Sequence, residues 1–251
     1  MELAREKFSR LLQERDFLDK NGVRVCVLGD ISLLSMDIQH LMTEGTEMTK
    51  HNDRAVLNVC VAYTSRQEIC SAMKDIAEGV SRQLIDPSDI SESLLEHCFY
   101  SDQPDLPDLL IRTSGEVRLS DFLLWQSSFS ILSFMPVLWP EFSRWHLYAG
   151  LLHYQMNAPA AQKARDEHLE RRRQQQLEFD LRSIEKTESD LSLSSSMSGL
   201  STVAGEKLLA EKLHKCQEAR DLRIATFLDF LRSRRDEYTA TILASRQSLS
   251  T

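Results

Sequence analysis

The sequence has no closely spaced pair of cysteines and no cluster of histidines. Its five cysteines form no C-x-x-C motif, so the sequence predicts no zinc site. Their odd number and the apolar surroundings of several favour reduced, mostly buried thiols in a protein that faces the cytosol. The seven histidines are scattered, which gives metal and nucleophile chemistry little support. The cysteines are Cys26, Cys60, Cys70, Cys98 and Cys216.

A long apolar run is also missing. No stretch approaches the roughly 20 residues that a membrane-spanning helix needs, and the first residues fit an amphipathic helix rather than a signal peptide. We therefore expect a soluble chain whose membrane contact is peripheral or passes through a partner. The formal net charge of -8 weighs against a nucleic-acid-binding protein, but it allows a local basic pocket for an anionic ligand.

The common signatures of nucleotide and hydrolase sites are absent. The sequence contains no G-x-G-x-x-G, no P-loop, no H-E-x-x-H and no G-x-S-x-G elbow. Any functional site must therefore be found from less common patterns.

Short apolar segments alternate with amphipathic ones along the first 160 residues. This order is typical of an α/β domain with a mostly parallel sheet flanked by helices. The pattern opens on a helix, as if the first strands were missing. The nearly continuous apolar run at 55–62 predicts a strand buried on both faces. Strands are expected at 23–28, 55–62, 108–112 and 130–135, and helices at 2–20, after Ser35, at 65–80, at 91–98, over the apolar run 119–126, and after Pro140.

The composition changes after Pro159. We expect a domain at 1–159, a charged helix at 160–186, a Ser-rich linker at 187–205 and a helical tail at 206–251. Such a tail cannot bury its own apolar face, so it is expected to pack on the domain or on another subunit.

The most informative segment runs from Asp108 to Ser120, DLLIRTSGEVRLS. Arg112 closes an apolar strand, and the carboxyl ends of parallel strands border the ligand crevice. Gly115 allows a tight turn, and Arg118 and Ser120 point the same way if that stretch is extended. Two guanidiniums and a hydroxyl at one point would bind a diphosphate, because arginine binds phosphate oxygens in bidentate fashion.

Spacing alone leaves a second interpretation open. Arg112 can instead pair with Asp105, Asp108 or Glu116, and Arg118 with Asp121. Glu116 either orients an arginine or is simply solvated. Arg66 follows the strand at 55–62 and occupies a comparable strand-end position.

The motifs RTSGEVRLSDFLLWQ and PVLWPEF resemble the signature of the cis-prenyltransferases, the undecaprenyl diphosphate and dehydrodolichyl diphosphate synthases. LNVCVAYTSRQEI and LIDPSDISESLLEHCFY look like the eukaryotic dehydrodolichyl diphosphate synthases in particular. The resemblance runs from Met1 to about Arg173, with a looser match in the helical tail.

The resemblance implies the cis-prenyltransferase fold and a reaction. The family condenses isopentenyl diphosphate onto an allylic diphosphate such as farnesyl diphosphate, with Mg²⁺ assisting departure of the allylic diphosphate. By resemblance, Arg112, Arg118 and Ser120 bind isopentenyl diphosphate. The growing chain is expected in an apolar tunnel, with helix 2–20 as part of its wall.

Two features of the family pattern are not found. The family's Asp-Gly-Asn-Arg segment, whose Asp binds Mg²⁺, is absent from the 251 residues, so no catalytic or metal-binding residue is assigned in this chain. A Glu near Ile131 and an Arg-x-Gly motif near the end, both present in single-subunit bacterial enzymes, are absent as well. The Arg-x-Gly motif is likewise absent from the eukaryotic catalytic subunits that this chain resembles, which borrow it from a Nogo-B-receptor-like partner.

The resemblance therefore predicts a subunit that makes polyprenyl diphosphate for dolichol synthesis. It is expected in a homo- or hetero-oligomer with such an accessory subunit, peripheral to the cytoplasmic face of the endoplasmic reticulum membrane. The competing hypothesis is a non-catalytic truncated subunit that acts as an interaction or regulatory partner of the synthase.

Overall fold

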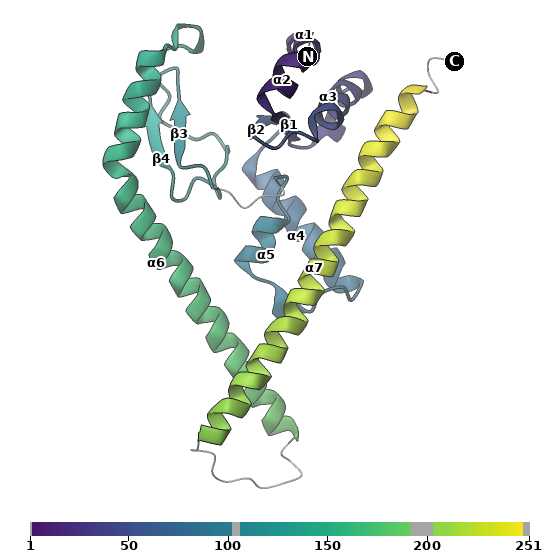
Figure 1. Ribbon diagram of the computed structural model, residues 1–251, viewed down its shortest axis with the longest axis vertical. Helices are drawn as coiled ribbons and strands as arrows, with labels where there is room; N and C mark the ends of the chain where they lie inside the picture. The colour runs from purple at the N-terminus through teal and green to yellow at the C-terminus, as the bar shows by residue number, and fades with distance from the viewer. Residues whose placement is uncertain (1, 102–105, 192–202, 248–251) are drawn as a thin grey trace. The chain divides into compact units, whose positions relative to one another are not determined.

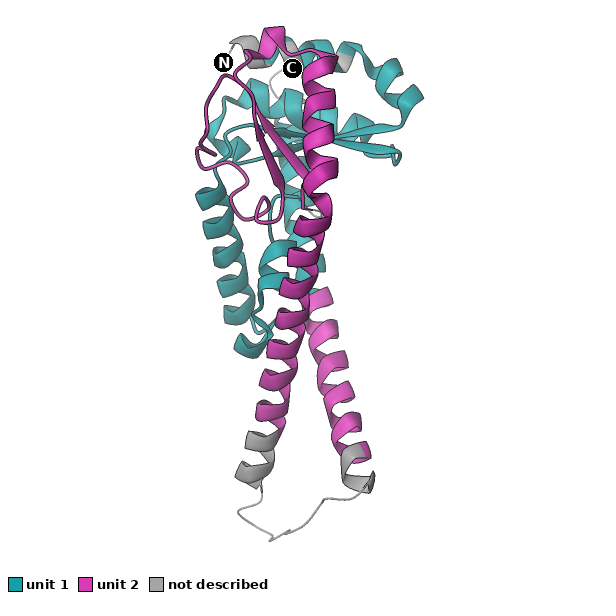
Figure 2. Cartoon of the chain, turned by 90° about the vertical axis from the view of Figure 1, so that its left-hand side faces the viewer, with its two compact units in different colours: residues 1–104, 226–251 teal, residues 105–225 magenta. Residues whose placement is uncertain are grey.

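The computed structural model of the protein describes residues 2–101, 106–191 and 203–247 (Figure 1). For 2–4, 7, 12, 185–191, 203–206 and 246–247 it describes the backbone alone. The chain divides into two compact units, one formed by residues 1–104 and 226–251 and the other by residues 105–225 (Figure 2).

The first unit is built on two parallel strands covered by helices. β1 pairs with β2 in a register that sets Val23 against Ala55 and Leu28 against Cys60. Gly22 ends the preceding helix at φ +64°, the left-handed conformation expected of its Asn-Gly sequence. The elements in order are α1 Glu2–Gln13, α2 Arg15–Asn21, β1 Val23–Leu28, η1 Ile31–Leu33, α3 Met36–Thr49, β2 Ala55–Cys60, α4 Ser65–Ser81, η2 Pro87–Asp89 and α5 Glu92–His97.

The core of this unit lies where α1 and α3 meet the sheet. Phe8 of α1 and Ile38 and Met42 of α3 form a buried cluster, against which Val27 and Val59 of the strands pack. The helix expected after Ser35 therefore buries Ile38 and Met42 as its pattern predicts, whereas Trp145, Leu152 and Met156, expected on the buried face of the helix after Pro140, are exposed.

The prediction for β2 was wrong in one respect. The strand was expected to be buried on both faces, yet residues 55–58 are exposed, with Val56 at 44% and Leu57 at 42%. β2 pairs with β1 alone among the described strands, so one of its edges and much of its surface lack a covering element.

The second half of α7 (Val203–Gln247) belongs to this unit and packs on α4. Phe227 and Leu231 are fully buried. A Cβ atom on Gly79 would lie 2.5 Å from the Phe227 ring, so only glycine admits this helix at that distance. Arg234 pairs with Asp75 and, at 2.7 Å, with Glu78. The tail thus packs on the domain, one of the two outcomes that its apolar residues predicted.

The second unit carries the other two strands. β3 (Leu109–Arg112) pairs in parallel with β4 (Ile131–Phe134), and helix α6 (Arg144–Leu191) covers them after the short turn η3 (Trp139–Glu141). α6 continues through Pro159, the predicted domain boundary. Residues 192–202, most of the expected Ser-rich linker, lie outside the described residues.

The helix expected over residues 119–126 is not there. That segment forms turns, because Ser120, Asp121 and Leu123 adopt positive φ angles of +51°, +61° and +47°. A right-handed helix cannot contain such residues, so the apolar run instead winds irregularly between β3 and β4.

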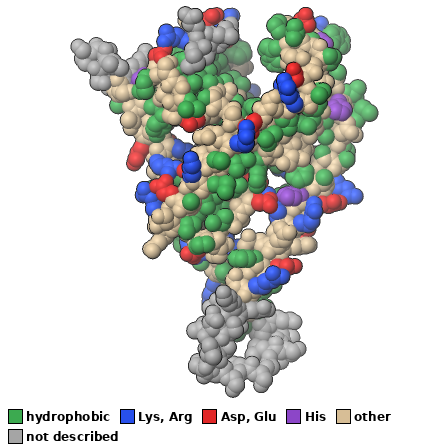
Figure 3. Space-filling model, turned by 180° about the vertical axis from the view of Figure 1, so that it is seen from behind, with side chains coloured by type: hydrophobic (Ala, Val, Ile, Leu, Met, Phe, Trp, Pro, Cys, Tyr) green, Lys and Arg blue, Asp and Glu red, His purple; other side chains and the backbone are tan. Residues whose placement is uncertain are grey.

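Among the described helices, none combines the length and apolarity needed to cross a membrane. Hydrophobic side chains reach the surface between charged ones on the face shown in Figure 3. On α6, Trp145, Leu152 and Met156 are 68%, 58% and 73% exposed.

A buried ion pair joins α6 to the first half of α7. Asp180 is fully enclosed and accepts hydrogen bonds from Arg220, at 3.0 Å for the Nη1 atom, and from Gln176 at 3.0 Å. Such a pair specifies which turns of two long helices face each other, because a shifted register would bury each charge alone.

We expect Asp180→Ala to lower the free energy of unfolding by about 3 kcal/mol or more, since it leaves the Arg220 guanidinium buried without its carboxylate. Urea denaturation followed by circular dichroism measures the change. Glu178→Ala is the matched control, because its pair with Arg182 is exposed, and it should change stability by less than about 0.5 kcal/mol. Equal effects would contradict this account of the pair.

The thiols differ in their surroundings more than the sequence indicated. All five are free, but Cys98 alone is buried, Cys70 is exposed, and the others are intermediate. Burial, followed by the charge of nearby Asp75, raises the pKa of the Cys98 thiol to about 12.

Because the thiolate is the reactive form, Cys98 should resist iodoacetamide at pH 8 while Cys70 is alkylated. A raised pKa means that the thiolate fraction of Cys98 stays small until the pH approaches 12. Peptide mass spectrometry after brief labelling measures both sites, and labelling in guanidinium, where both should react, is the control. Comparable labelling of the two in the folded protein would contradict the burial of Cys98.

Candidate functional site

The strand–turn segment after β3 holds the residues that the sequence singled out. β3 ends at Arg112, whose carbonyl oxygen accepts a hydrogen bond from the Met135 amide at 2.8 Å. The parallel ladder with β4 therefore runs to the last residue of the strand. Arg112 is thus fixed at the carboxyl edge of this two-stranded sheet, the edge at which parallel sheets bind ligands.

A tight turn follows at Ser114 and Gly115, with φ angles of +72° and +70°. The Ser114 amide donates to the Val137 carbonyl oxygen at 2.7 Å, and the Gly115 amide donates to that of Met135 at 3.0 Å. These two bonds tie the turn to the segment after β4. No side-chain pattern in the sequence marks Met135 and Val137 as anchors, because they act through backbone carbonyls.

The Arg112 side chain crosses this turn and contacts the segment that follows it. Its Nη1 atom donates to the Ser120 hydroxyl oxygen at 3.0 Å and to the backbone carbonyl oxygen of Arg118. The structure therefore brings Arg112 and Ser120 together. Among the described residues no carboxylate pairs with Arg112, and Asp105 lies outside them.

Arg118 points to solvent, with its side chain 71% exposed. Its Nε atom lies 3.1 Å from the Glu116 carboxylate, which is 45% exposed. Glu116, rather than Asp121, is thus the carboxylate that Arg118 meets. Two guanidiniums and a hydroxyl lie on one short, accessible segment, which can bind an anion such as a phosphate.

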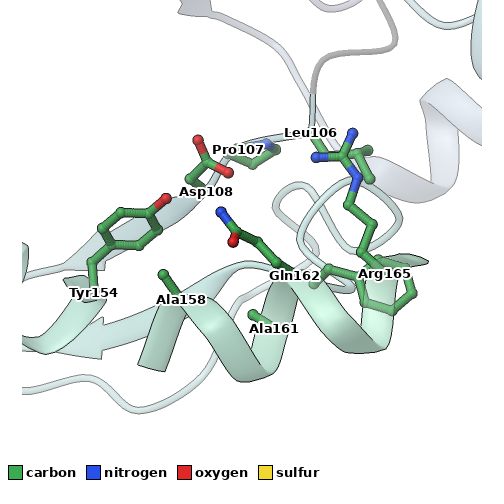
Figure 4. Close-up of a pocket in the computed structure, with 9 residues that line it drawn as sticks. Leu106, Pro107, Asp108, Tyr154, Ala158, Ala161, Gln162 and Arg165 are labelled. Atoms are coloured by element: carbon green, nitrogen blue, oxygen red, sulfur yellow. The ribbon is translucent and has the colours of Figure 1, made fainter. Parts of the chain in front are cut away.

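Asp108 stands at the other end of β3 and lines a shallow pocket on the α6 side (Figure 4). The pocket has an empty volume of about 330 Å³, open solvent included, and its floor is formed by Ala158 and Ala161. Asp108 and Tyr154 lie at one end of the pocket and Arg165 lies at the other (Figure 4). Asp108 therefore does not take part in the site around Arg112.

The carboxyl edge of the other sheet, in the first unit, contains a buried carboxylate. Glu68, 2% exposed, accepts hydrogen bonds from the Tyr63 hydroxyl at 2.5 Å and the Tyr100 amide at 3.0 Å. Burial, followed by the bond to Glu68, raises the pKa of Tyr63 above its usual range. The sequence did not indicate this cluster, because Glu68 lies within the helix expected at 65–80 and Tyr100 lies 32 residues further along the chain. Arg66, at the start of α4, is exposed.

Among the described residues, no three His, Cys, Asp or Glu side chains gather as metal ligands do. Hard cations such as Mg²⁺ prefer several oxygen ligands. The residues that the structure describes therefore do not fit the ion that the resemblance implies.

Known proteins similar to this chain show the family to which it belongs. The sequence profile of the family described as "putative undecaprenyl diphosphate synthase" matches residues 1–160. The human dehydrodolichyl diphosphate synthase complex subunit DHDDS is 48% identical over 242 residues, which are 96% of this chain and 71% of that protein. The tritrans,polycis-undecaprenyl-diphosphate synthase (geranylgeranyl-diphosphate specific) of Methanocaldococcus jannaschii is 40% identical over 157 residues, 62% of this chain and 56% of that protein.

Among solved structures, the chain is similar to lavandulyl diphosphate synthase from Lavandula x intermedia in complex with dimethylallyl diphosphate. The TM-score is 0.57 and the identity 31%, over 61% of this chain and 66% of that one. The predicted fold, parallel sheets flanked by helices with a helical tail, is confirmed.

We expect Gly115→Ala to destabilise the turn by about 1–2 kcal/mol, because a Cβ atom disfavours the left-handed conformation. Space does not limit this substitution, since the added carbon would lie 3.8 Å from the nearest atom, in Pro136. Gly115→Asn is the control, because asparagine tolerates positive φ, and it should retain more of the stability. The urea midpoints compare the two variants, and an alanine variant as stable as the native protein would refute a left-handed Gly115.

Proposed function

Since this chain belongs to the cis-prenyltransferase family, we propose that it takes part in cis-prenyl chain elongation. The substrates are isopentenyl diphosphate and an allylic diphosphate such as farnesyl diphosphate, and the product is polyprenyl diphosphate for dolichol synthesis. Prenyl transfer is the chemistry of the family, and the relatives named above are synthases of this kind.

The observation that carries the proposal is the segment that follows β3. Arg112, Arg118 and Ser120 are the residues that we call the diphosphate clamp. Arg112 and Ser120 are hydrogen-bonded at the carboxyl edge of the β3–β4 sheet, and the Arg118 side chain extends from the same segment into solvent. Guanidinium groups bind phosphate oxygens through charge-assisted hydrogen bonds, and a diphosphate supplies several acceptor oxygens. The exposure of Arg118 leaves its guanidinium accessible to such a ligand.

In the reaction, the clamp binds and orients isopentenyl diphosphate. Two guanidiniums hold the diphosphate at a fixed point, so that the apolar end of the molecule extends away from the charge toward the allylic carbon. The π electrons of isopentenyl diphosphate form the new carbon–carbon bond, and diphosphate leaves the allylic carbon with the electron pair of its C–O bond. Loss of a proton from C2 of the isopentenyl unit then forms the new double bond. Mg²⁺ is proposed as the cofactor of the synthase, and no residue of this chain is assigned as its ligand.

We further propose that the chain works in a heteromer with a Nogo-B-receptor-like accessory subunit. It would lie at the cytoplasmic face of the endoplasmic reticulum membrane. The description of the human relative as a complex subunit supports the heteromer.

We expect Arg118→Ala to raise the KM for isopentenyl diphosphate by about 10-fold or more, the effect of losing a charge-assisted hydrogen bond. The assay is Mg²⁺-dependent incorporation of labelled isopentenyl diphosphate, with farnesyl diphosphate and the co-expressed accessory subunit. Arg173→Ala is the control, since Arg173 forms an exposed pair on α6.

An unchanged KM in Arg118→Ala would refute the clamp. If the native chain binds isopentenyl diphosphate but forms no product, the competing hypothesis of a non-catalytic subunit is favoured.

A further inference from the structure

The contact between Glu116 and Arg118 is unusual for a site that binds anions. A carboxylate beside a phosphate-binding arginine adds negative charge where a diphosphate must approach. Yet the backbone fixes both residues close together. The turn at Ser114 and Gly115 is tied to the segment after β4, and the Arg118 carbonyl oxygen accepts a hydrogen bond from Arg112. The two residues are two positions apart in a segment that forms neither helix nor strand, and their contact shows that the two side chains lie on the same side of it.

The geometry of the pair shows which part of the guanidinium is engaged. The closest approach, 3.1 Å, joins the Glu116 carboxylate to the Nε atom of Arg118. A guanidinium carries five N–H donors, and a carboxylate on the Nε edge leaves donors on the terminal nitrogens for another acceptor. Those donors are the fork that binds phosphate oxygens in bidentate fashion.

From this geometry we infer that Glu116 is a positioning residue for the clamp and does not compete with the diphosphate. The inference rests on the proposed function. Arg118 is exposed and has a long, flexible side chain, so ordering it on binding costs entropy. Glu116 holds the guanidinium by its inner edge before the ligand arrives, which removes part of that cost. Solvent weakens the repulsion between the exposed carboxylate and the diphosphate.

The test compares the dissociation constant of isopentenyl diphosphate, measured by titration calorimetry, for the full chain and its variants. Glu116→Ala removes the ion-pair partner of Arg118 and should weaken binding about two- to tenfold, the effect of one unordered side chain. Glu116→Gln keeps an acceptor for the Nε–H and removes the charge, so it should bind at least as tightly as the native chain. Glu116→Ala combined with Arg118→Ala should bind no more weakly than Arg118→Ala alone, because Glu116 acts through Arg118.

Glu178→Ala, which breaks an exposed pair with Arg182 on α6, is the matched control and should leave the dissociation constant unchanged. Two results would overturn the inference and leave the clamp in place. In one, both Glu116 variants bind more tightly, which makes Glu116 a competitor. In the other, Glu116→Ala has no effect although Arg118→Ala weakens binding. If Arg118→Ala itself has no effect, the clamp fails and the role of Glu116 fails with it.

Discussion

The candidate site depends on the hydrogen bonds that the Arg112 guanidinium donates back across its own turn. They join the end of β3 to the Arg118 carbonyl oxygen and the Ser120 hydroxyl, and so close a loop of nine residues. Without them, Arg118 and Ser120 would belong to an irregular segment with no fixed relation to the sheet. A single side chain therefore gives an unstructured stretch the geometry that binding requires. The positive φ angles at both ends of the loop are stable because these bonds offset their conformational cost.

How far the sequence predicted this arrangement depends on the kind of signal. The strands and the ends of most helices followed from local chemistry, such as the Asn-Gly at the end of α2 and the apolar run of β1. The composition of the clamp followed from residue type, and its meaning came from the resemblance. The apolar run at 119–126 was misassigned because hydrophobicity does not report φ. Ser120 and Asp121 adopt left-handed conformations, and the Ser120 hydroxyl accepts a hydrogen bond from Arg112, eight residues earlier in the chain.

Long-range contacts were also beyond local patterns. Two contacts join residues that lie far apart in the chain. The Phe227 ring packs on Gly79, and Asp180 forms an ion pair with Arg220. A single sequence contains the residues of such contacts but does not show which of them contact each other in the fold. The buried Glu68 illustrates the same difficulty, since its partner Tyr100 lies on a loop after a different helix. Asp180 and Glu68 lie on helices whose sequences suggest solvated carboxylates, yet both are buried because a distant segment packs over them.

The packing of Phe227 on Gly79 also governs when the first unit can complete its fold. During synthesis, residues 1–101 leave the ribosome with the surface of α4 that receives Phe227 still uncovered, and that surface stays apolar and open until the end of α7 is made. About 150 residues separate the two halves of this contact, so closing it is slow compared with forming the helices themselves. Chaperones that bind exposed apolar surface can therefore bind this part of α4 until α7 is complete. A chain that ends before Phe227 would leave the same surface permanently exposed.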